Sequence, residues 1–152
     1  MTLTVKNWYY IFDRYDRWDI LVDSLQYCKL NKDLKLYGFV FMLNHIHLIV
    51  HSTNIAGFIR DFKRYTSKKI IENIRKTEPN VLTLFQKENS QYQLWTKTNI
   101  PKKIESEKFF LQKLNYIHEN PVRKSYVLKP EHWYWSSVNP DCELQSNCFE
   151  EL

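Results

Sequence analysis

The order of apolar and polar residues along the chain predicts an alternation of strands and helices. Residues 2–6 alternate in the manner of a short strand, and apolar residues that recur every three to four positions predict a helix over residues 16–31. Two apolar stretches, 34–42 and 45–51, flank a tight reversal at Asn44. We therefore expect these stretches to be two strands that form a β-hairpin.

The pattern continues with a long helix and another strand. Ser, Thr and Asn at positions 52–54 are residues that cap helices, and an apolar stripe at helical spacing predicts a helix over residues 55–77. Residues 78–90 are polar, which predicts a mobile loop. Residues 92–97 are typical of another strand.

A last helix is expected over residues 105–119, where Asn120 and Pro121 end it because proline disfavours the helical conformation in the residue before it. The elements before this helix follow the order βαββαβ, which is that of a ferredoxin-like antiparallel sheet. The sequence thus predicts the α+β class, with helices on one face of the sheet and the other face open. We expect one domain over residues 1–138 and an acidic tail over residues 139–152, which contain four acidic residues and neither Lys nor Arg.

Two histidines separated by one residue, His45 and His47, lie in the second strand of the hairpin. Because successive side chains of a strand point to opposite faces, we expect both imidazoles on one face, roughly 6–7 Å apart along the backbone, and Ile46 and Leu48 on the other. Two imidazoles on one face of a strand are able to hold a metal ion. Most such pairs are structural or exposed instead, so the metal interpretation requires a further ligand.

The last predicted helix offers candidates for that ligand. Tyr116 and Asn120 are four residues apart and share a helix face, so a phenol oxygen and an amide oxygen would both face a metal held by the histidines. The competing interpretation makes Tyr116 a packing residue and Asn120 a helix cap before Pro121. The spacing alone does not decide between the two.

Composition narrows the kinds of function. Apolar residues make up 43% of the 152 residues, enough for a core, and the 2 glycines are too few for glycine-rich phosphate-binding loops. The net charge of +5 favours nucleic acid over a membrane as partner. The three cysteines show no CxxC and no disulfide-framework spacing, no apolar run is long enough to cross a membrane, and no signal peptide is visible, so we expect a cytoplasmic protein.

Three segments carry a resemblance to a known family. They are a His-Ile-His strand within residues 42–50, a Tyr-x-x-x-Asn-Pro helix within residues 116–122 and an aromatic segment at residues 133–137. In this order they resemble the HUH-type single-tyrosine transposases, in particular the branch associated with REP palindromes of bacterial genomes. The resemblance spans about residues 2–138.

The resemblance implies a role for each matching residue. It implies that His45 and His47 bind magnesium or manganese, that Asn120 is a third ligand and that Tyr116 is the nucleophile. The implied activity is nicking and rejoining of single-stranded or hairpin DNA through a 5′-phosphotyrosine intermediate, by a nucleoid-associated monomer or homodimer. A phenol with a pKa of about 10 is a weak nucleophile at neutral pH, so the metal ion would have to neutralise charge on the scissile phosphate.

Basic residues are expected to contact the DNA backbone. Arg60, Arg64 and Lys68 recur every four residues on the helix over 55–77 and form a stripe that we expect beside the histidine strand. Further candidates for phosphate contacts are Lys63, Lys69 and Lys97. An ordinary solvated helix face is the competing interpretation of the stripe. The aromatic residues 133–135 are expected either to stack on unpaired bases or to pack the C-terminal segment onto the sheet.

Two other functions are compatible with these residues. One is a non-catalytic, domesticated module of the same fold that binds single-stranded nucleic acid. The other is a metal-dependent ribonuclease, although no clear pair of general acid and base accompanies His45. A covalent protein–DNA adduct distinguishes the transferase from the binding module, and RNA cleavage that survives loss of Tyr116 would indicate the ribonuclease.

Overall fold

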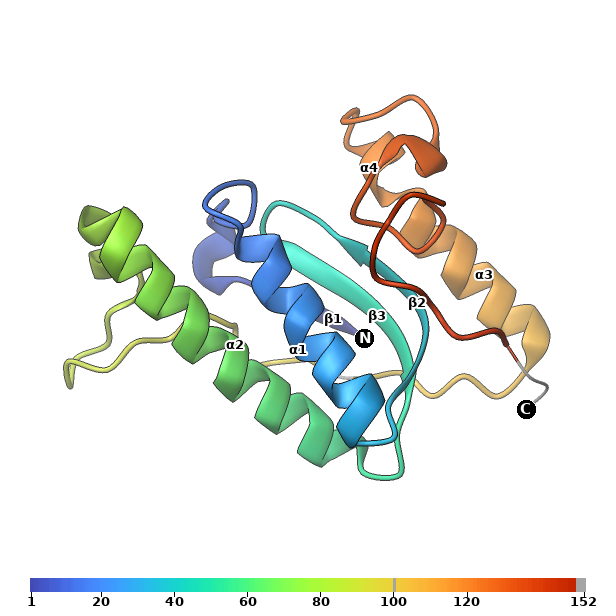
Figure 1. Cartoon of the computed structure of the whole chain (residues 1–152), viewed down its shortest axis with the longest axis horizontal. Helices are drawn as coiled ribbons and strands as arrows, with labels where there is room; N and C mark the ends of the chain where they lie inside the picture. Colours follow the sequence, from blue (N-terminus) through green and yellow to red (C-terminus); the bar gives the residue numbers. More distant parts are fainter. Residues whose placement is uncertain (100, 150–152) are drawn as a thin grey trace.

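The computed structural model of the chain describes residues 1–99 and 101–149. Its centre is a sheet of three antiparallel strands in the order β1-β3-β2 (Figure 1). The strands are β1 (Thr2–Thr4), β2 (Lys35–Phe41) and β3 (His45–His51). The predicted hairpin of β2 and β3 is confirmed, and a hydrogen bond of 2.8 Å from Met42 N to His45 O closes its reversal.

Helices lie on both sides of this sheet (Figure 1). They are α1 (Arg17–Asn31), α2 (Ile55–Thr77), α3 (Glu107–His118) and the short α4 (Asn120–Arg123), together with the 3-10 turns η1 (Lys6–Trp8), η2 (Pro79–Phe85) and η3 (Pro130–His132). The predicted α+β class is confirmed, and both long helices agree with their predicted bounds to within one residue. Within the described ranges, no helix is both long and apolar enough to cross a membrane.

The main hydrophobic core lies between the sheet and the helices α1 and α2. Ile46 and Leu48 of β3 are buried there against Leu25 of α1 and Phe62 and Ile70 of α2. Full burial of an aliphatic or aromatic side chain contributes about 1.5–3 kcal/mol, so this apolar layer is the main source of stability. It also explains why the helical spacing of apolar residues in α1 and α2 was readable from the sequence.

The prediction that the second face of the sheet is open is wrong, because α3 packs against it. A smaller core joins Ile49 of β3 to Phe110 and Ile117 of α3. Gly38 of β2 permits this close approach: a Cβ atom at this position would lie 2.4 Å from Cδ1 of Leu114. The glycine therefore serves the docking of α3, which brings the Tyr116 helix onto the histidine face.

The predicted fourth strand over residues 92–97 does not form as a strand. Its segment lies along the free edge of β1, where Val5 and Trp95 form an isolated bridge and Thr96 N donates to Thr4 O at 2.8 Å. Trp95 is buried in the main core, which holds the segment at this edge. The polar residues that follow do not extend the pairing, so the sheet keeps three strands.

Two further segments differ from the prediction. Residues 78–90 were expected to be a loop, but η2 occupies Pro79–Phe85 and ends on Phe85, which is fully buried in the main core. Because most residues of this segment are polar, the sequence did not indicate that its one phenylalanine, Phe85, packs in the core. Pro121 does not end the helical structure, because a second short helix, α4, begins at Asn120. Pro121 lies in the first turn of α4, where the backbone N–H groups make no hydrogen bond within the helix, so its missing N–H is tolerated.

The predicted acidic tail, residues 139–152, is described as far as residue 149. Cys142 and Leu144 are buried in the main core. Asn147 pairs with β2, since Leu36 N donates to its Oδ1 at 2.9 Å and its own N–H donates to Leu36 O at 2.6 Å. This part of the tail therefore packs on the domain, and residues 150–152 lie outside the described residues.

A buried arginine joins the beginning of α1 to the end of α2. The Arg17 side chain is inaccessible to solvent and donates to Ile11 O (3.0 Å), Asn73 Oδ1 (2.9 Å), Thr77 Oγ1 (3.1 Å) and Glu78 Oε2 (2.7 Å). Burial opposes ionisation of Glu78, but the hydrogen bonds from Arg17 and Arg14 hold the pKa of its carboxyl below the ordinary value. A buried charge is tolerated only with such partners.

Replacing Arg17 with methionine should lower the free energy of unfolding by about 3–5 kcal/mol, because it removes the buried partner of Glu78. Urea unfolding at neutral pH measures the loss. Arg14→Met is the matched control: Arg14 binds the same carboxylate at 3.0 Å, but its side chain is 35% exposed, so we expect a loss below about 1 kcal/mol. Equal losses in the two variants would show that burial is not what makes Arg17 important.

Candidate active site

Strand β3 presents both histidines to the sheet face on which α3 packs. His45 and His47 are buried there, with ring centroids 4.9 Å apart and ring planes nearly perpendicular, at 89°. Ile46 and Leu48 belong to the main core on the other face, so the predicted alternation along this strand is confirmed.

His47 is anchored by the neighbouring strand. Thr2 of β1 is its partner in the sheet register, and the Thr2 hydroxyl lies 2.9 Å from Nδ1 of the imidazole. The other ring nitrogen, Nε2, is buried and has no hydrogen-bond partner among the described residues. Leaving a buried polar atom unpaired is unfavourable by about 1–3 kcal/mol, so this nitrogen marks a position for a further binding partner.

Asn44 determines which nitrogen of His45 is protonated. Nδ2 of Asn44 donates to the carbonyl oxygen of Trp8 at 2.9 Å. Because that carbonyl is only an acceptor, Oδ1 of Asn44 must be the atom that faces Nδ1 of His45, at 2.7 Å. Nδ1 therefore carries the proton and Nε2 carries the lone pair, which is the arrangement of a histidine that binds a metal ion through Nε2.

Burial keeps both imidazoles neutral. It lowers the pKa of His45 to about 4 and that of His47 to about 3, from an ordinary value of 6.5. The charge of neighbouring ionisable groups acts in the same direction: Lys124 on His45, and on His47 the imidazole of His45 when protonated, the amino terminus of Met1 and Arg123. Neutral imidazole is the form that coordinates metal ions, so the pair is ready to do so at physiological pH.

The two candidate residues that the sequence places one helical turn apart, Tyr116 and Asn120, differ in exposure. The Tyr116 side chain is 54% exposed, so Tyr116 is not a packing residue. Asn120 is buried, and its amide donates to the carbonyl oxygens of Tyr116 (3.4 Å) and Ile117 (3.3 Å), so it does cap the helix. No hydrogen bond from the described residues occupies Oδ1 of Asn120, which leaves that oxygen for a further partner.

Two basic residues that the sequence pattern does not single out, Arg123 and Lys124, lie at the end of α4. Nη2 of Arg123 donates to Tyr116 O at 2.6 Å, and its Cζ lies 4.4 Å from the centre of the Tyr116 ring. Its charge acts on His47, as that of Lys124 acts on His45. Neither cation takes part in a salt bridge within the described part of the chain. Their sequence signal is only their position after the Asn-Pro motif.

The residues at this site fit a magnesium or manganese ion that is completed by oxygen ligands. Residues 1–99 and 101–149 contain no group of three or more His, Cys, Asp and Glu side chains placed to hold a metal ion. His45 and His47 would supply two nitrogen ligands, one of them the unpartnered Nε2, and a third protein ligand would have to be of another kind, such as Oδ1 of Asn120. Both ions accept such oxygens and readily keep water or phosphate in their other positions.

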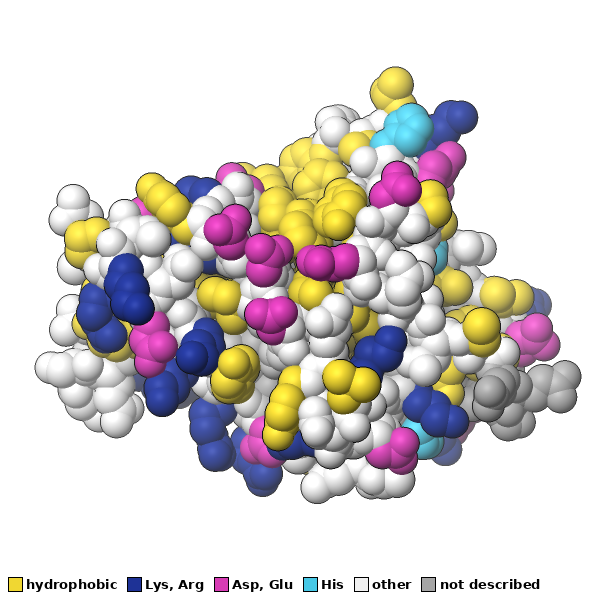
Figure 2. Space-filling view, viewed as in Figure 1, with side chains coloured by type: hydrophobic (Ala, Val, Ile, Leu, Met, Phe, Trp, Pro, Cys, Tyr) yellow, Lys and Arg dark blue, Asp and Glu magenta, His cyan; other side chains and the backbone are white. Residues whose placement is uncertain are grey.

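The basic stripe of α2 lies on the opposite side of the sheet from the histidines, so the expectation that it flanks the histidine strand is wrong. The apolar face of α2 packs in the main core, which the sheet separates from His45 and His47. Arg60, Arg64, Lys68 and Lys69 are exposed, and Figure 2 shows Lys and Arg side chains gathered over α2. Arg60 also binds the neighbouring Asp61 at 3.0 Å.

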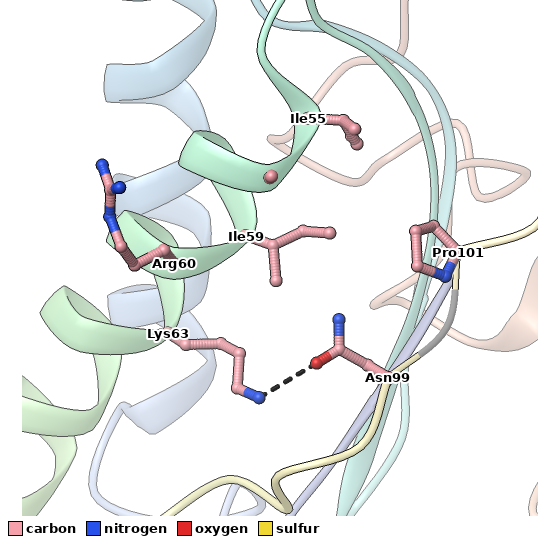
Figure 3. Close-up of a pocket in the computed structure, with 7 residues that line it drawn as sticks. Ile55, Ile59, Arg60, Lys63, Asn99 and Pro101 are labelled. Atoms are coloured by element: carbon pink, nitrogen blue, oxygen red, sulfur yellow. Dashed lines mark hydrogen bonds between the residues drawn. The ribbon is translucent and has the colours of Figure 1, made fainter.

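Lys63 differs from the other basic residues of α2. It lines a hollow of about 540 Å³ between the first turns of α2 and the segment that precedes α3 (Figure 3). Its Nζ donates to Thr96 O at 2.8 Å and to Asn99 Oδ1 at 3.0 Å, and burial lowers its pKa. These bonds tether the segment to α2, whereas Lys97 in that segment is exposed.

The aromatic segment at residues 133–135 mostly packs against the protein. Nε1 of Trp133 donates to Phe41 O at 2.8 Å, and the Trp135 ring lies 5.2 Å from that of Trp18. The packing interpretation is confirmed for both tryptophans, while Tyr134 between them is 41% exposed.

The fold is similar to that of a solved structure, a REP-associated tyrosine transposase bound to a REP hairpin. The TM-score is 0.69 at 14% sequence identity, and the match covers 98% of this chain and 90% of that chain. At this identity the similarity shows the fold, so the resemblance predicted from the motifs is confirmed at the level of the fold. No protein-family model and no curated protein matches the chain.

Stability should fall as the pH is lowered below about 6.5. Histidines of the unfolded chain take up protons near that pH, whereas folded His45 and His47 do so only at about 4 and about 3. The unfolded state therefore binds more protons in this window, and the free energy of unfolding rises with pH until it levels off above the unfolded pKa.

Urea unfolding of the wild type and of the His47→Gln variant at a series of pH values between about 7.5 and 5 checks this dependence. The wild type should lose more stability over this range than the variant. His118, whose pKa burial also lowers to about 4, is present in both proteins and cancels in the comparison. Parallel pH profiles would show that His47 is not held neutral by burial.

Proposed function

We propose that the chain is a metal-dependent DNA strand transferase that acts on single-stranded or hairpin DNA with Tyr116 as its nucleophile. The observation that carries the proposal is a pair of buried, neutral histidines, one with an unpartnered Nε2, on the sheet face where the helix of an exposed tyrosine packs. The similarity of the fold to a tyrosine transposase bound to a REP hairpin supports the same class of substrate.

The histidines and Asn120 would hold the ion. His45 and His47 would contribute their Nε2 atoms, and Asn120 its Oδ1. Magnesium or manganese, when bound, supplies positive charge that polarises the scissile phosphate and neutralises the charge that develops on it. Asn44 and Thr2 keep the two rings oriented through their Nδ1 atoms, as outer-shell partners of metal-binding histidines do.

Tyr116 performs the covalent step. Its phenolic oxygen attacks phosphorus and forms the new phosphorus–oxygen bond, while the bond from phosphorus to the 3′ oxygen breaks. The phenol gives up its proton, and the leaving 3′ oxygen takes one up and becomes a 3′-hydroxyl. The product is a 5′-phosphotyrosine. Attack of a 3′-hydroxyl on this linkage rejoins a strand without ATP, because the phosphodiester energy is retained.

The exposed side of α2 would bind the DNA backbone away from the reacting phosphate. Arg64, Lys68 and Lys69 are exposed and carry no salt bridge among the described residues. Cations of this kind position a nucleic acid through its phosphates and carry no base specificity.

Tyr116→Phe should abolish the covalent DNA adduct and leave hairpin binding and folding near wild type, because the change removes one exposed oxygen and keeps the ring. A labelled DNA hairpin with a single-stranded extension is incubated with the protein and manganese, and the products are separated on a denaturing gel. His47→Ala should suppress the adduct through loss of the metal ligand. Tyr27→Phe, on the exposed side of α1, is the matched control and should form the adduct normally.

Two outcomes would contradict the proposal. Adduct formation by Tyr116→Phe at the wild-type rate would exclude Tyr116 as the nucleophile. Wild-type protein that binds the hairpin and forms no adduct with either magnesium or manganese would favour the non-catalytic binding module.

Arg64→Ala and Lys68→Ala should each weaken binding to unrelated DNA sequences alike and reduce the slope of log affinity against log salt by about one unit. Arg60→Ala should have a smaller effect, because Arg60 already pairs with Asp61. Titrations at several salt concentrations measure the slope, with Arg64→Lys as the control that keeps the charge. Wild-type slopes in both alanine variants would leave the stripe an ordinary solvated surface.

A further inference from the structure

The turn η1 holds a large exposed aromatic side chain beside His45. Trp8 is 60% exposed, and its indole meets the imidazole of His45 edge-on, with ring centroids 5.7 Å apart and planes at 71°. The carbonyl of Trp8 accepts the hydrogen bond from Asn44, whose other amide atom binds His45. The Asn44 side chain thus connects the backbone of Trp8 to the imidazole of His45 through two hydrogen bonds.

The backbone that carries Trp8 is strained. Asn7 and Trp8 have φ angles of 55° and 59°, in the left-handed region that bulky side chains disfavour. Tyr15 shares this conformation, but the guanidinium of Arg17 lies 5.2 Å from the centre of its ring. Trp8 has no such cover: among the described side chains no cation lies over its ring, and its aromatic contact is the edge-on one with His45. The fold therefore keeps most of the Trp8 side chain in solvent at a conformational cost.

Two exposed cations act on the histidines next to this indole. Arg123 ends α4 and Lys124 follows it, and their charges add to burial in lowering the pKa of His47 and of His45, the imidazole that the indole contacts. Neither side chain is neutralised by a salt bridge in the described part of the protein. An open aromatic face beside unpaired cations is the combination that binds single-stranded nucleic acid, where the ring stacks on a base and the cations hold phosphates. A paired base in the interior of a duplex has both faces covered and is unable to stack in this way.

We propose that Trp8 and Lys124 form a subsite for one unpaired nucleotide adjacent to the cleavage position, in which the indole stacks on the base and the ammonium group binds a phosphate. The subsite distinguishes an unpaired nucleotide from a paired one, and not one base from another, because every base has a π face. Its place in the reaction rests on the proposed function, but binding there requires neither the metal ion nor Tyr116.

The test measures equilibrium binding of the full chain in EDTA, where no strand is cut. The probes are a DNA hairpin with a short single-stranded 5′ extension, the same hairpin with a blunt end, and extended hairpins in which one nucleotide at a time is abasic. The proteins are the wild type, Trp8→Ala, Trp8→Phe and the matched control Tyr27→Ala, which removes an aromatic ring of similar exposure (57%) from α1.

Trp8→Ala should bind the extended hairpin roughly tenfold more weakly and the blunt hairpin as the wild type does. An abasic nucleotide at one position should weaken wild-type binding to a similar degree and have no effect on Trp8→Ala. Trp8→Phe should retain most of the affinity, and Tyr27→Ala all of it. Lys124→Gln should lower the salt slope for the extended hairpin by about one unit, whereas Lys35→Gln, at the far end of β2, should not.

Equal losses on extended and blunt hairpins, or abasic effects that are the same with and without Trp8, would overturn the proposal. So would a Trp8→Ala variant that keeps its affinity for DNA and changes the sedimentation of the DNA-free protein, because the indole would then be a protein contact. A failure of adduct formation in the preceding assay would not alter these results, so the two proposals fail separately.

Discussion

The alternation of side chains along β3 is the constraint on which the rest of the structure depends. Ile46 and Leu48 enter the main core, and the residues between and beside them, His47 and His45, lie on the opposite face of the sheet, the face on which α3 packs. Both neighbouring strands fix this register, since His47 lies opposite Thr2 of β1 and Val40 of β2. A shift by one residue would place two imidazoles in the apolar core and two aliphatic chains at the site. Burial of Ile46 and Leu48 in the main core therefore fixes the side of the sheet on which His45 and His47 lie.

Covering this face with α3 has a chemical consequence. Because the histidines lie on a covered face of the sheet, burial keeps them neutral. The Nδ1 partner of His47 is Thr2 of the distant strand β1, whereas that of His45 is the adjacent Asn44. Asn44 serves both the imidazole of His45 and the backbone of Trp8. The same packing places Tyr116 near the end of α3, so a buried pair of histidines and an exposed tyrosine occur on one side of the sheet.

The cations of the chain occupy two separate surfaces. The stripe on α2 is backed by the main core, whereas Arg123 ends α4 and Lys124 follows it, and the charges of these two residues act on the histidines. In the proposed function these surfaces have different tasks: the α2 surface holds DNA without regard to sequence, and the α4 cations act near the phosphate that reacts. Net charge alone does not reveal this division, because it depends on which side of the sheet each helix packs.

The sequence by itself determined the features that depend on local periodicity: the bounds of α1 and α2, the hairpin and the shared face of His45 and His47. The side of the sheet on which α3 packs, the lost fourth strand and the buried anchor Phe85 were decided by tertiary structure, since each depends on packing between distant segments. The motif residues were predictable because their spacing is local. The unpartnered Nε2 of His47 and the exposed indole of Trp8 were not, because hydrogen bonding and exposure are properties of the assembled chain, in which residues far apart in sequence become neighbours.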